Sequence, residues 1–392
     1  MKKNQSHYIQ LDLIIMLILL MSISILAIYN AQQLGQYPGQ NFVVKQILFY
    51  CISISVLAAM QFIDLEQLYK ASLYIFIFGA FLVIALHFSP ESIAEPKNGA
   101  KSWFNNKIPF VSIQPSEFTK IALIVFLSAL IVRHKEKFEI ATIWTDLWLI
   151  LKIIIVTIIP TAFIYNQPDL GTSLVFLFIA GVLIILSGVN WKILITLIVG
   201  GSAAVALSIL LILNLPEFSE EVLGIKPHQI KRVVTWLDPT EQDPNDRYHI
   251  ELSLLTIGSG QLIGKGMNHS EVNIPEAHTD FIFSIIGESF GFIGGAILIL
   301  LFFLLLYRLV TLGMKVYPND PFGAYICFGY MSLILIHTFQ NIGMTIGIMP
   351  ITGIPLLFIS YGGSTILSTI IGYALVYKIA IEDSLRQEFL FK

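Results

Sequence analysis

About ten apolar segments of roughly 20 residues recur along this chain, and an α-helix of that length can cross the hydrocarbon core of a bilayer. They lie near residues 13–29, 44–62, 68–88, 115–132, 144–165, 172–186, 191–215, 281–307, 322–342 and 356–377. Only 12% of the 392 residues are charged, whereas about 25% are charged in ordinary soluble domains. The sequence therefore predicts an all-α integral membrane protein with about ten transmembrane helices in a single polytopic domain, residues 1–392.

A long polar stretch, residues 216–279, separates predicted helices seven and eight. Connections of this length are usually functional. Residues 230–237 place apolar side chains at helical spacing with Lys231 and Arg232 beside them, which predicts a short interfacial helix. The apolar run 250–263 is too short to span a bilayer and is interpreted as re-entrant or interfacial.

Lysine and arginine are unevenly distributed over the short predicted loops, and cytoplasmic loops are normally the richer ones. With the N-terminus inside, twelve lie on the cytoplasmic side: Lys2, Lys3, Lys70, Arg133, Lys135, Lys137, Lys192, Arg308, Lys315, Lys378, Arg386 and Lys392. Four lie in the short outer loops: Lys45, Lys97, Lys101 and Lys107. The distribution predicts that both termini are cytoplasmic and that residues 216–279 are extracellular.

The end of the long loop carries the first polar feature inside a predicted span. Thr279 and Asp280 are good N-cap residues, which predicts a helix start there with Asp280 at the positive end. Ser284 and Glu288 follow at four-residue spacing on one helix face, and glycines at the same spacing over 287–295 allow another helix to approach closely in the membrane. Acidic residues at this depth usually face a cavity or a partner. Helix capping by Asp280 and ion pairing by Glu288 are the alternatives.

Two further polar features lie at the predicted outer ends of spans. Glu117 and Lys120 are three residues apart, so they share a helix face and can neutralise each other. A structural pair and a substrate site explain them equally well. Asp169 precedes an apolar segment, and helix capping alone would explain it.

The last polar feature is a run of prolines and glycines over residues 347–364, which predicts a broken helix. Broken helices at membrane depth usually line a cavity, where their free backbone N–H groups suit an anion such as a phosphate. Ser360, Gly362 and Gly363 lie in this run. A packing kink is the weaker alternative.

Other reactive residue types are given no special role. Cys51 and Cys327 lie inside apolar segments and are interpreted as small buried hydrophobic residues. His278 has no ligand-like spacing with other histidines and is interpreted as an ordinary loop residue. The sequence contains no nucleotide-binding loop and no zinc-type spacing. We therefore expect no nucleic-acid partner.

Several motifs together resemble the SEDS family of bacterial membrane proteins (shape, elongation, division and sporulation), and its RodA branch most closely. These motifs are Gly-Ala-Lys-Ser-Trp-Phe at 99–104, Gln-Pro-Ser-Glu at 114–117, Asp-Leu-Gly-Thr at 169–172, Ile-Gly-Ser-Gly at 257–260, Thr-Asp-Phe-Ile-Phe at 279–283, Gly-Glu-Ser-Phe-Gly at 287–291, and the run 341–364. The resemblance covers nearly the whole chain.

The resemblance implies a ten-helix protein of the bacterial cytoplasmic membrane. It implies an enzyme for cell elongation and cell shape that polymerises lipid II into peptidoglycan strands. A class B penicillin-binding protein and the elongation machinery would be its partners. Asp280 matches the essential acid of the family.

The chemistry of this reaction needs few groups, because a lipid-linked diphosphate is already a good leaving group. One carboxylate, Asp280, would suffice to deprotonate the attacking sugar hydroxyl. Charge developing on the diphosphate needs cationic side chains, backbone N–H groups or a metal ion. The predicted substrate-binding residues are Glu117, Lys120, Asp169, Arg232, Glu288, Ser360, Gly362 and Gly363. The sequence establishes no cofactor and leaves open a divalent cation, Mg²⁺ or Mn²⁺, at Asp280.

Two other classes of function fit some of the same features. A lipid II flippase would also use intramembrane acids, a Glu–Lys pair and a broken helix. A non-catalytic scaffold for the penicillin-binding protein is the third class. The clustering of the acids on one side and the lack of a visible internal repeat favour the enzyme.

Overall fold

The computed structural model describes residues 9–36, 39–95, 101–104, 113–214, 244–269 and 272–390. Within these ranges the chain is helical, apart from one isolated bridge between Phe104 and Ile113. The helices are α1 (Leu11–Gln33), α2 (Phe42–Met60), α3 (Leu65–Phe88), α4 (Pro115–Lys137), α5 (Ile143–Asn166), α6 (Leu170–Leu186), α7 (Trp191–Asn214), α10 (Pro244–Ser259), α11 (Ile282–Val316), α12 (Pro321–Thr345) and α13 (Gly363–Leu390). The predicted all-α architecture is confirmed over the described ranges.

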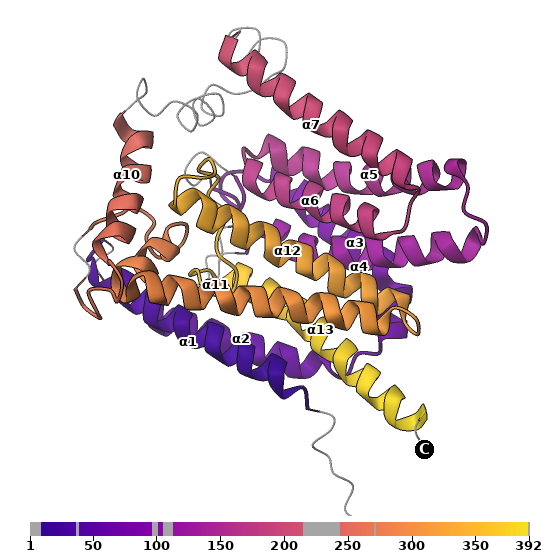
Figure 1. Cartoon of the computed structure of the whole chain (residues 1–392), viewed down its shortest axis with the longest axis horizontal. Coiled ribbons are helices and arrows are strands. Elements are labelled where there is room, and N and C mark those ends of the chain that lie inside the picture. The colour runs from indigo at the N-terminus through magenta and orange to yellow at the C-terminus, as the bar shows by residue number, and fades with distance from the viewer. Residues whose placement is uncertain are drawn as a thin grey trace, which may run out of the picture.

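Every predicted apolar segment contains a helix, although the last one, 356–377, is helical only from Gly363 onward. Nine helices in the described part of the chain are long and apolar enough to cross a membrane. The one remaining predicted span, 172–186, corresponds to α6. Its 17 residues are at the lower end of the range of about 17–25 that can span a bilayer. The apolar run 250–263 overlaps α10, a 16-residue helix that packs beside α11 at one end of the bundle (Figure 1). The interfacial helix predicted at 230–237 lies outside the described residues.

Two helices form the centre of the bundle. In the apolar windows of α4 and α12, 83% and 78% of the residues are buried, whereas none is buried in that of α7. α7 lies at the edge of the bundle, beyond α5 and α6 (Figure 1). Cys327 is buried in α12 as predicted, but Cys51 is exposed on α2. The prediction for Cys51 was wrong because an apolar helix in a membrane also has a lipid-facing side.

α11 is broken at Gly291, whose φ of 64° and ψ of −162° are not helical. Four backbone hydrogen bonds of 2.9–3.1 Å join residues 288–293 to residues 261–266, which replace the helical bonds lost at the break. A Cβ atom at Gly291 would collide with the backbone of residues 262–264. A helix approaches closely at Gly287, where Ile257 of α10 would lie 3.1 Å from an added Cβ atom. At Gly291 the close partner is instead the non-helical segment that follows α10.

Candidate functional site

A cavity of about 430 Å³ opens where the polar features of the sequence meet. Its lining residues come from α2, the loop before α4, the starts of α4, α6 and α13, the turn before α11, α12 and the segment between α12 and α13. They include Glu117, Asp169, Asp280, Gly362 and Gly363. The structure thus brings together five residues that the sequence singles out from four separate stretches.

Polar side chains of α12 hold the broken segment that precedes α13. The amide of Gln340 donates to the carbonyl of Pro350 at 3.1 Å, and that of Asn341 donates to the carbonyl of Ile354 at 2.9 Å. His337 contacts the carbonyl of Pro355 through Nδ1 at 2.9 Å. These residues follow i, i+3 and i+4 spacing, so they lie on one face of α12. That face satisfies carbonyl groups that a non-helical backbone would otherwise leave unpaired.

Asp280 lies in a turn before α11, half-buried at the cavity. The helix begins at Ile282 with Phe281 as its N-cap and with no capping side chain, so the prediction that Thr279 and Asp280 cap it was wrong. The turn is instead stabilised by its own backbone, including a bond from the N–H of Thr279 to the carbonyl of Glu276 at 3.1 Å. Phe281 thus takes the N-cap position, and Asp280 lies one residue before it, in the turn.

The broken segment lies directly against the Asp280 turn. A Cβ atom at Gly353 would be 3.3 Å from Oδ2 of Asp280. The hydroxyl of Ser360 donates to the carbonyl of Thr279 at 2.7 Å, and the N–H of Tyr361 donates to that of His278 at 2.9 Å. Ser360 is 2% exposed and is absent from the cavity lining, so its described contacts are structural.

Glu117 and Lys120 form an ion pair of 2.8 Å in which both side chains are almost completely buried. The hydroxyl of Ser368 donates to the second carboxylate oxygen of Glu117 at 3.3 Å. Glu117 lines the cavity, whereas Lys120 lies behind it. The pairing inferred from their spacing is confirmed, and it places one carboxylate at the cavity wall with a cation directly behind.

Asp169 both caps a helix and lines the cavity. Its Oδ1 accepts from the N–H of Thr172 at 2.9 Å, and its Oδ2 accepts from the hydroxyl of the same residue. The amide of Gln114 lies 3.5 Å from Oδ2. The capping interpretation is confirmed, and the carboxylate faces the cavity from the start of α6.

Glu288 points away from this cavity. Its side chain is fully buried and pairs with Lys265 at 2.9 Å, in the segment that follows α10. One turn earlier, Ser284 shares a hydrogen bond of 2.7 Å with Ser253 of α10. The stripe below Asp280 therefore faces α10, and the ion-pairing alternative for Glu288 is confirmed. Arg232 lies outside the described residues.

Three aromatic side chains form a cluster beside Asp280. The imidazole of His278 stacks on Phe42 with ring centroids 4.2 Å apart, and Tyr361 lies 5.6 Å from the same imidazole. His278 and Tyr361 line the cavity, as does Trp103. Burial lowers the pKa of His278 from its usual value, while nearby Glu276 acts in the opposite direction. The interpretation of His278 as an ordinary loop residue was wrong, because His278 lines the cavity and stacks on Phe42. Its position in the sequence does not indicate this contact.

A metal ion at Asp280 would need coordinating atoms besides those of the described side chains. Within the described ranges, no group of three or more His, Cys, Asp or Glu side chains could hold a metal ion. A Mg²⁺ or Mn²⁺ ion at Asp280 would therefore take its other ligands from water and from phosphate oxygens of a substrate, which is how Mg²⁺ is often bound.

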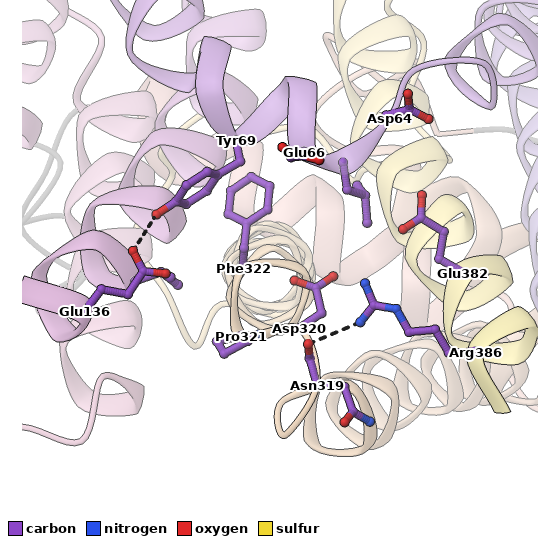
Figure 2. A pocket seen from close by; sticks show the side chains of 12 residues that line it. Asp64, Glu66, Tyr69, Glu136, Asn319, Asp320, Pro321, Phe322, Glu382 and Arg386 are labelled. Carbon is purple, nitrogen blue, oxygen red and sulfur yellow. Dashed lines mark hydrogen bonds between the residues drawn. The ribbon is translucent and has the colours of Figure 1, made fainter. Parts of the chain in front are cut away.

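Figure 2 shows a second hollow, of about 480 Å³. It lies at the opposite end of the bundle, because the end of α4 lines it whereas the start of α4 lines the first cavity. It is lined by the starts of α3 and α12 and by the last turns of α4 and α13. Asp320 caps α12 by accepting from the N–H of Gly323 at 3.0 Å, and Glu136 accepts from the hydroxyl of Tyr69 at 3.2 Å. Arg386 donates to the carbonyl of Asn319 at 3.2 Å. These contacts are structural, so we take the first cavity as the candidate site.

The fold and the first cavity define a class: a helical membrane protein in which acidic residues meet a broken helix at one end of the bundle. A family model described as "Cell cycle protein", covering FtsW, RodA and SpoVE, matches residues 4–385. The chain belongs to this family.

Two relatives illustrate the similarity. The chain is 33% identical over 346 residues to the "Probable peptidoglycan glycosyltransferase FtsW" of Wigglesworthia glossinidia brevipalpis, covering 87% of this chain and 84% of the relative. It is 32% identical over 362 residues to "Stage V sporulation protein E" of Bacillus subtilis strain 168, covering 90% and 92%.

Solved structures share the fold. A chain of a peptidoglycan synthase complex aligns with a TM-score of 0.75 at 24% identity, covering 95% of this chain and 98% of that one. The rod shape determining protein RodA of Thermus thermophilus aligns with a TM-score of 0.64 at 23% identity, covering 94% and 95%. The relatives carry FtsW and SpoVE names while a structural neighbour is RodA, so the similarity does not single out one branch.

Proposed function

We propose that this protein is a peptidoglycan glycosyltransferase that polymerises lipid II, with Asp280 as the general base. The observation that carries the proposal is the placement of the Asp280 carboxyl group at the cavity, beside Gly353 and in the turn before α11. FtsW relatives bear the name of this activity. A base must lie within hydrogen-bond reach of the hydroxyl it deprotonates, and a carboxyl group on a cavity wall can meet that condition.

The leaving diphosphate needs positive charge or N–H donors. The starts of α6 and α13 both border the cavity, through Leu170 and through Gly362 and Gly363. Helix N-termini favour anions because their first N–H groups lack helical partners and the helix dipole is positive there. The start of α13 is the better anion site, since the Asp169 carboxylate already caps the start of α6. Gly362 and Gly363 would then bind phosphate oxygens through backbone N–H groups.

A direct assay tests this function. Purified protein in detergent or vesicles is incubated with lipid II, and the products are separated by size. We expect glycan polymer. A protein that is folded and monodisperse but makes no polymer would contradict the proposal, and faster movement of labelled lipid II across a vesicle membrane would then support the flippase.

The orientation follows from the distribution of Lys and Arg, which puts both termini in the cytoplasm and the first cavity at the outer face. We test it with single cysteines in a Cys51→Ala background, because Cys51 is exposed. His269→Cys, beyond α10, should react with a membrane-impermeant maleimide on intact cells. Lys137→Cys, at the end of α4, should react only after permeabilisation. The reverse labelling pattern would show that the orientation in the membrane is opposite to the proposed one.

The proposed partner is a class B penicillin-binding protein, and the proposed role is cell elongation and cell shape. The structural neighbour from a peptidoglycan synthase complex, in which polymerization and crosslinking are coordinated, supports a cross-linking partner. The proposed role in shape rests on the resemblance of the sequence motifs to the RodA branch, whose Thermus thermophilus member shares the fold. Depletion of the protein should give rounded cells, whereas filamentous cells would indicate a role in division instead.

A further inference from the structure

His337 lies between the buried ion pair and the broken segment. Its ring is 1% exposed, with Nδ1 at 2.9 Å from the carbonyl oxygen of Pro355 and Nε2 at 3.2 Å from Nζ of Lys120. A carbonyl oxygen can only accept, so Nδ1 carries the proton. An ammonium group can only donate, so Nε2 is the unprotonated acceptor. The contacts therefore define one tautomer of a neutral imidazole.

The position of the Lys120 ammonium group depends on its contact with the His337 imidazole. Lys120 is 1% exposed and donates to two described acceptors, Glu117 Oε1 at 2.8 Å and His337 Nε2. Both acceptors line the cavity, while Lys120 lies behind them. An ammonium group on a flexible stem adopts a fixed position only when several acceptors hold it. Without Nε2, the ammonium would be free to shift toward Glu117.

We propose that His337 is a positioning residue for the reaction, holding the Lys120 ammonium at a fixed distance behind the cavity wall. The same ring is bonded to Pro355, two residues after Gly353, which borders Asp280. His337 thus sets the position of the cation relative to the segment beside the base. The charge would then act on the developing diphosphate from a constant place, which is how preorganised groups lower a barrier. This inference rests on the proposed function.

Two isosteres separate this role from a packing role. Asn at 337 can still donate to Pro355 from the position of Nδ1 but offers nothing where Nε2 lies. Gln at 337 can present its carbonyl oxygen near the position of Nε2 and accept from Lys120, while losing the bond to Pro355. If positioning of Lys120 is what matters, His337→Asn should lower the kcat of lipid II polymerisation about tenfold or more with KM little changed, as for a group displaced from its productive place. His337→Gln should retain most of the rate.

A pure packing role predicts the opposite order, with Asn active and Gln inactive, and that order would overturn the inference. The matched control is His134→Asn, because His134 contacts Lys152 at the same distance of 3.2 Å at the far end of α4. It should leave the rate unchanged. Thermal stability is measured for all variants, and the rates are compared among those that remain folded.

A spectroscopic readout is independent of activity. Nitrogen-15 NMR of labelled histidine should show, at His337, a protonated Nδ1 and an unprotonated Nε2 whose signal shifts in the double variant Glu117→Gln/Lys120→Met. A protonated Nε2 would overturn the inference whatever the rates. Wild-type protein that makes no polymer would overturn the proposed function and this role with it. Active wild-type protein together with fully active His337→Asn would overturn this role alone.

Discussion

The side-chain amide of Asn341 donates a hydrogen bond of 2.8 Å to the backbone carbonyl of Asp280. The same amide nitrogen bonds the carbonyl of Ile354 at 2.9 Å, so one side chain of α12 joins the turn before α11 to the broken segment before α13. Asn341 is fully buried. The position of the proposed base is therefore set from α12, a helix that contributes no carboxylate to the cavity.

Removing this link should displace the base. Asn341→Ala removes this donor from the buried carbonyl of Ile354 and the part-buried carbonyl of Asp280, which we expect to cost about 1–3 kcal/mol and to lower activity strongly. Unfolding temperature and polymerisation rate are measured together. Thr338→Val is the matched control, because the hydroxyl of Thr338 is buried in α12 without a hydrogen-bond partner among the described residues. A fully active, fully stable Asn341→Ala protein would show that the link is dispensable.

Asp280→Asn should abolish polymer formation, because an amide of the same size cannot accept the proton. Membrane insertion and lipid II binding should persist, and Asp280→Glu should keep part of the activity. The control is Asp320→Asn at the opposite end of the bundle, where the side chain caps α12 and Asn caps equally well. Near wild-type polymerisation by Asp280→Asn would rule out the base.

Single substitutions of the Glu117–Lys120 pair should destabilise the protein. Glu117→Ala or Lys120→Ala leaves a buried charge without its partner, and such changes cost about 3–5 kcal/mol. The double variant Glu117→Gln/Lys120→Met removes both charges and should recover folded protein while remaining inactive. The yield of monodisperse protein and its unfolding temperature are the readouts. Recovery of activity in the double variant would mean that the pair serves folding alone.

Gly291→Ala should lower the amount of folded protein. The positive φ of 64° strains any residue with a side chain, and the added methyl group would collide with residues 262–264. Gly181→Ala, on α6, is the control, because a Cβ atom there meets nothing within 4 Å. Equal yields for the two variants would show that the break in α11 tolerates a side chain.

Stability should fall in mild acid partly because of His278. Burial lowers its pKa in the folded protein below the usual 6.5, so the unfolded chain binds the proton first as the pH falls. The contribution of a neutral His278 is complete above the unfolded pKa and is lost as the pH falls from that value through the folded pKa. His278→Phe keeps a ring against Phe42 and should show a smaller drop in unfolding temperature between pH 7.5 and 5.5. Equal drops would exclude His278 as the cause.

Much of the architecture followed from residue patterns. Each apolar segment formed a helix over most of its length, because a helix satisfies the polar groups of its own backbone at membrane depth. The spacing of Glu117 and Lys120 correctly predicted their pairing, since residues three apart share a helix face. The polar residues 337, 340 and 341 of α12 have i, i+3 and i+4 spacing in an apolar segment, which indicates one polar face of a helix. The predicted site did not include them.

The sequence by itself determined the class of protein, the position of the spans and the polar stretches that converge at one end. Only the tertiary structure decided which way each polar face points. Glu288 shares a stripe with Ser284, yet that stripe faces α10 and Lys265 instead of the cavity. Helical periodicity states which residues lie on one face, but the neighbour of that face is set by packing between segments far apart in the chain. For the same reason, the contact of His337 with Lys120, 217 residues away, has no local signature in the sequence.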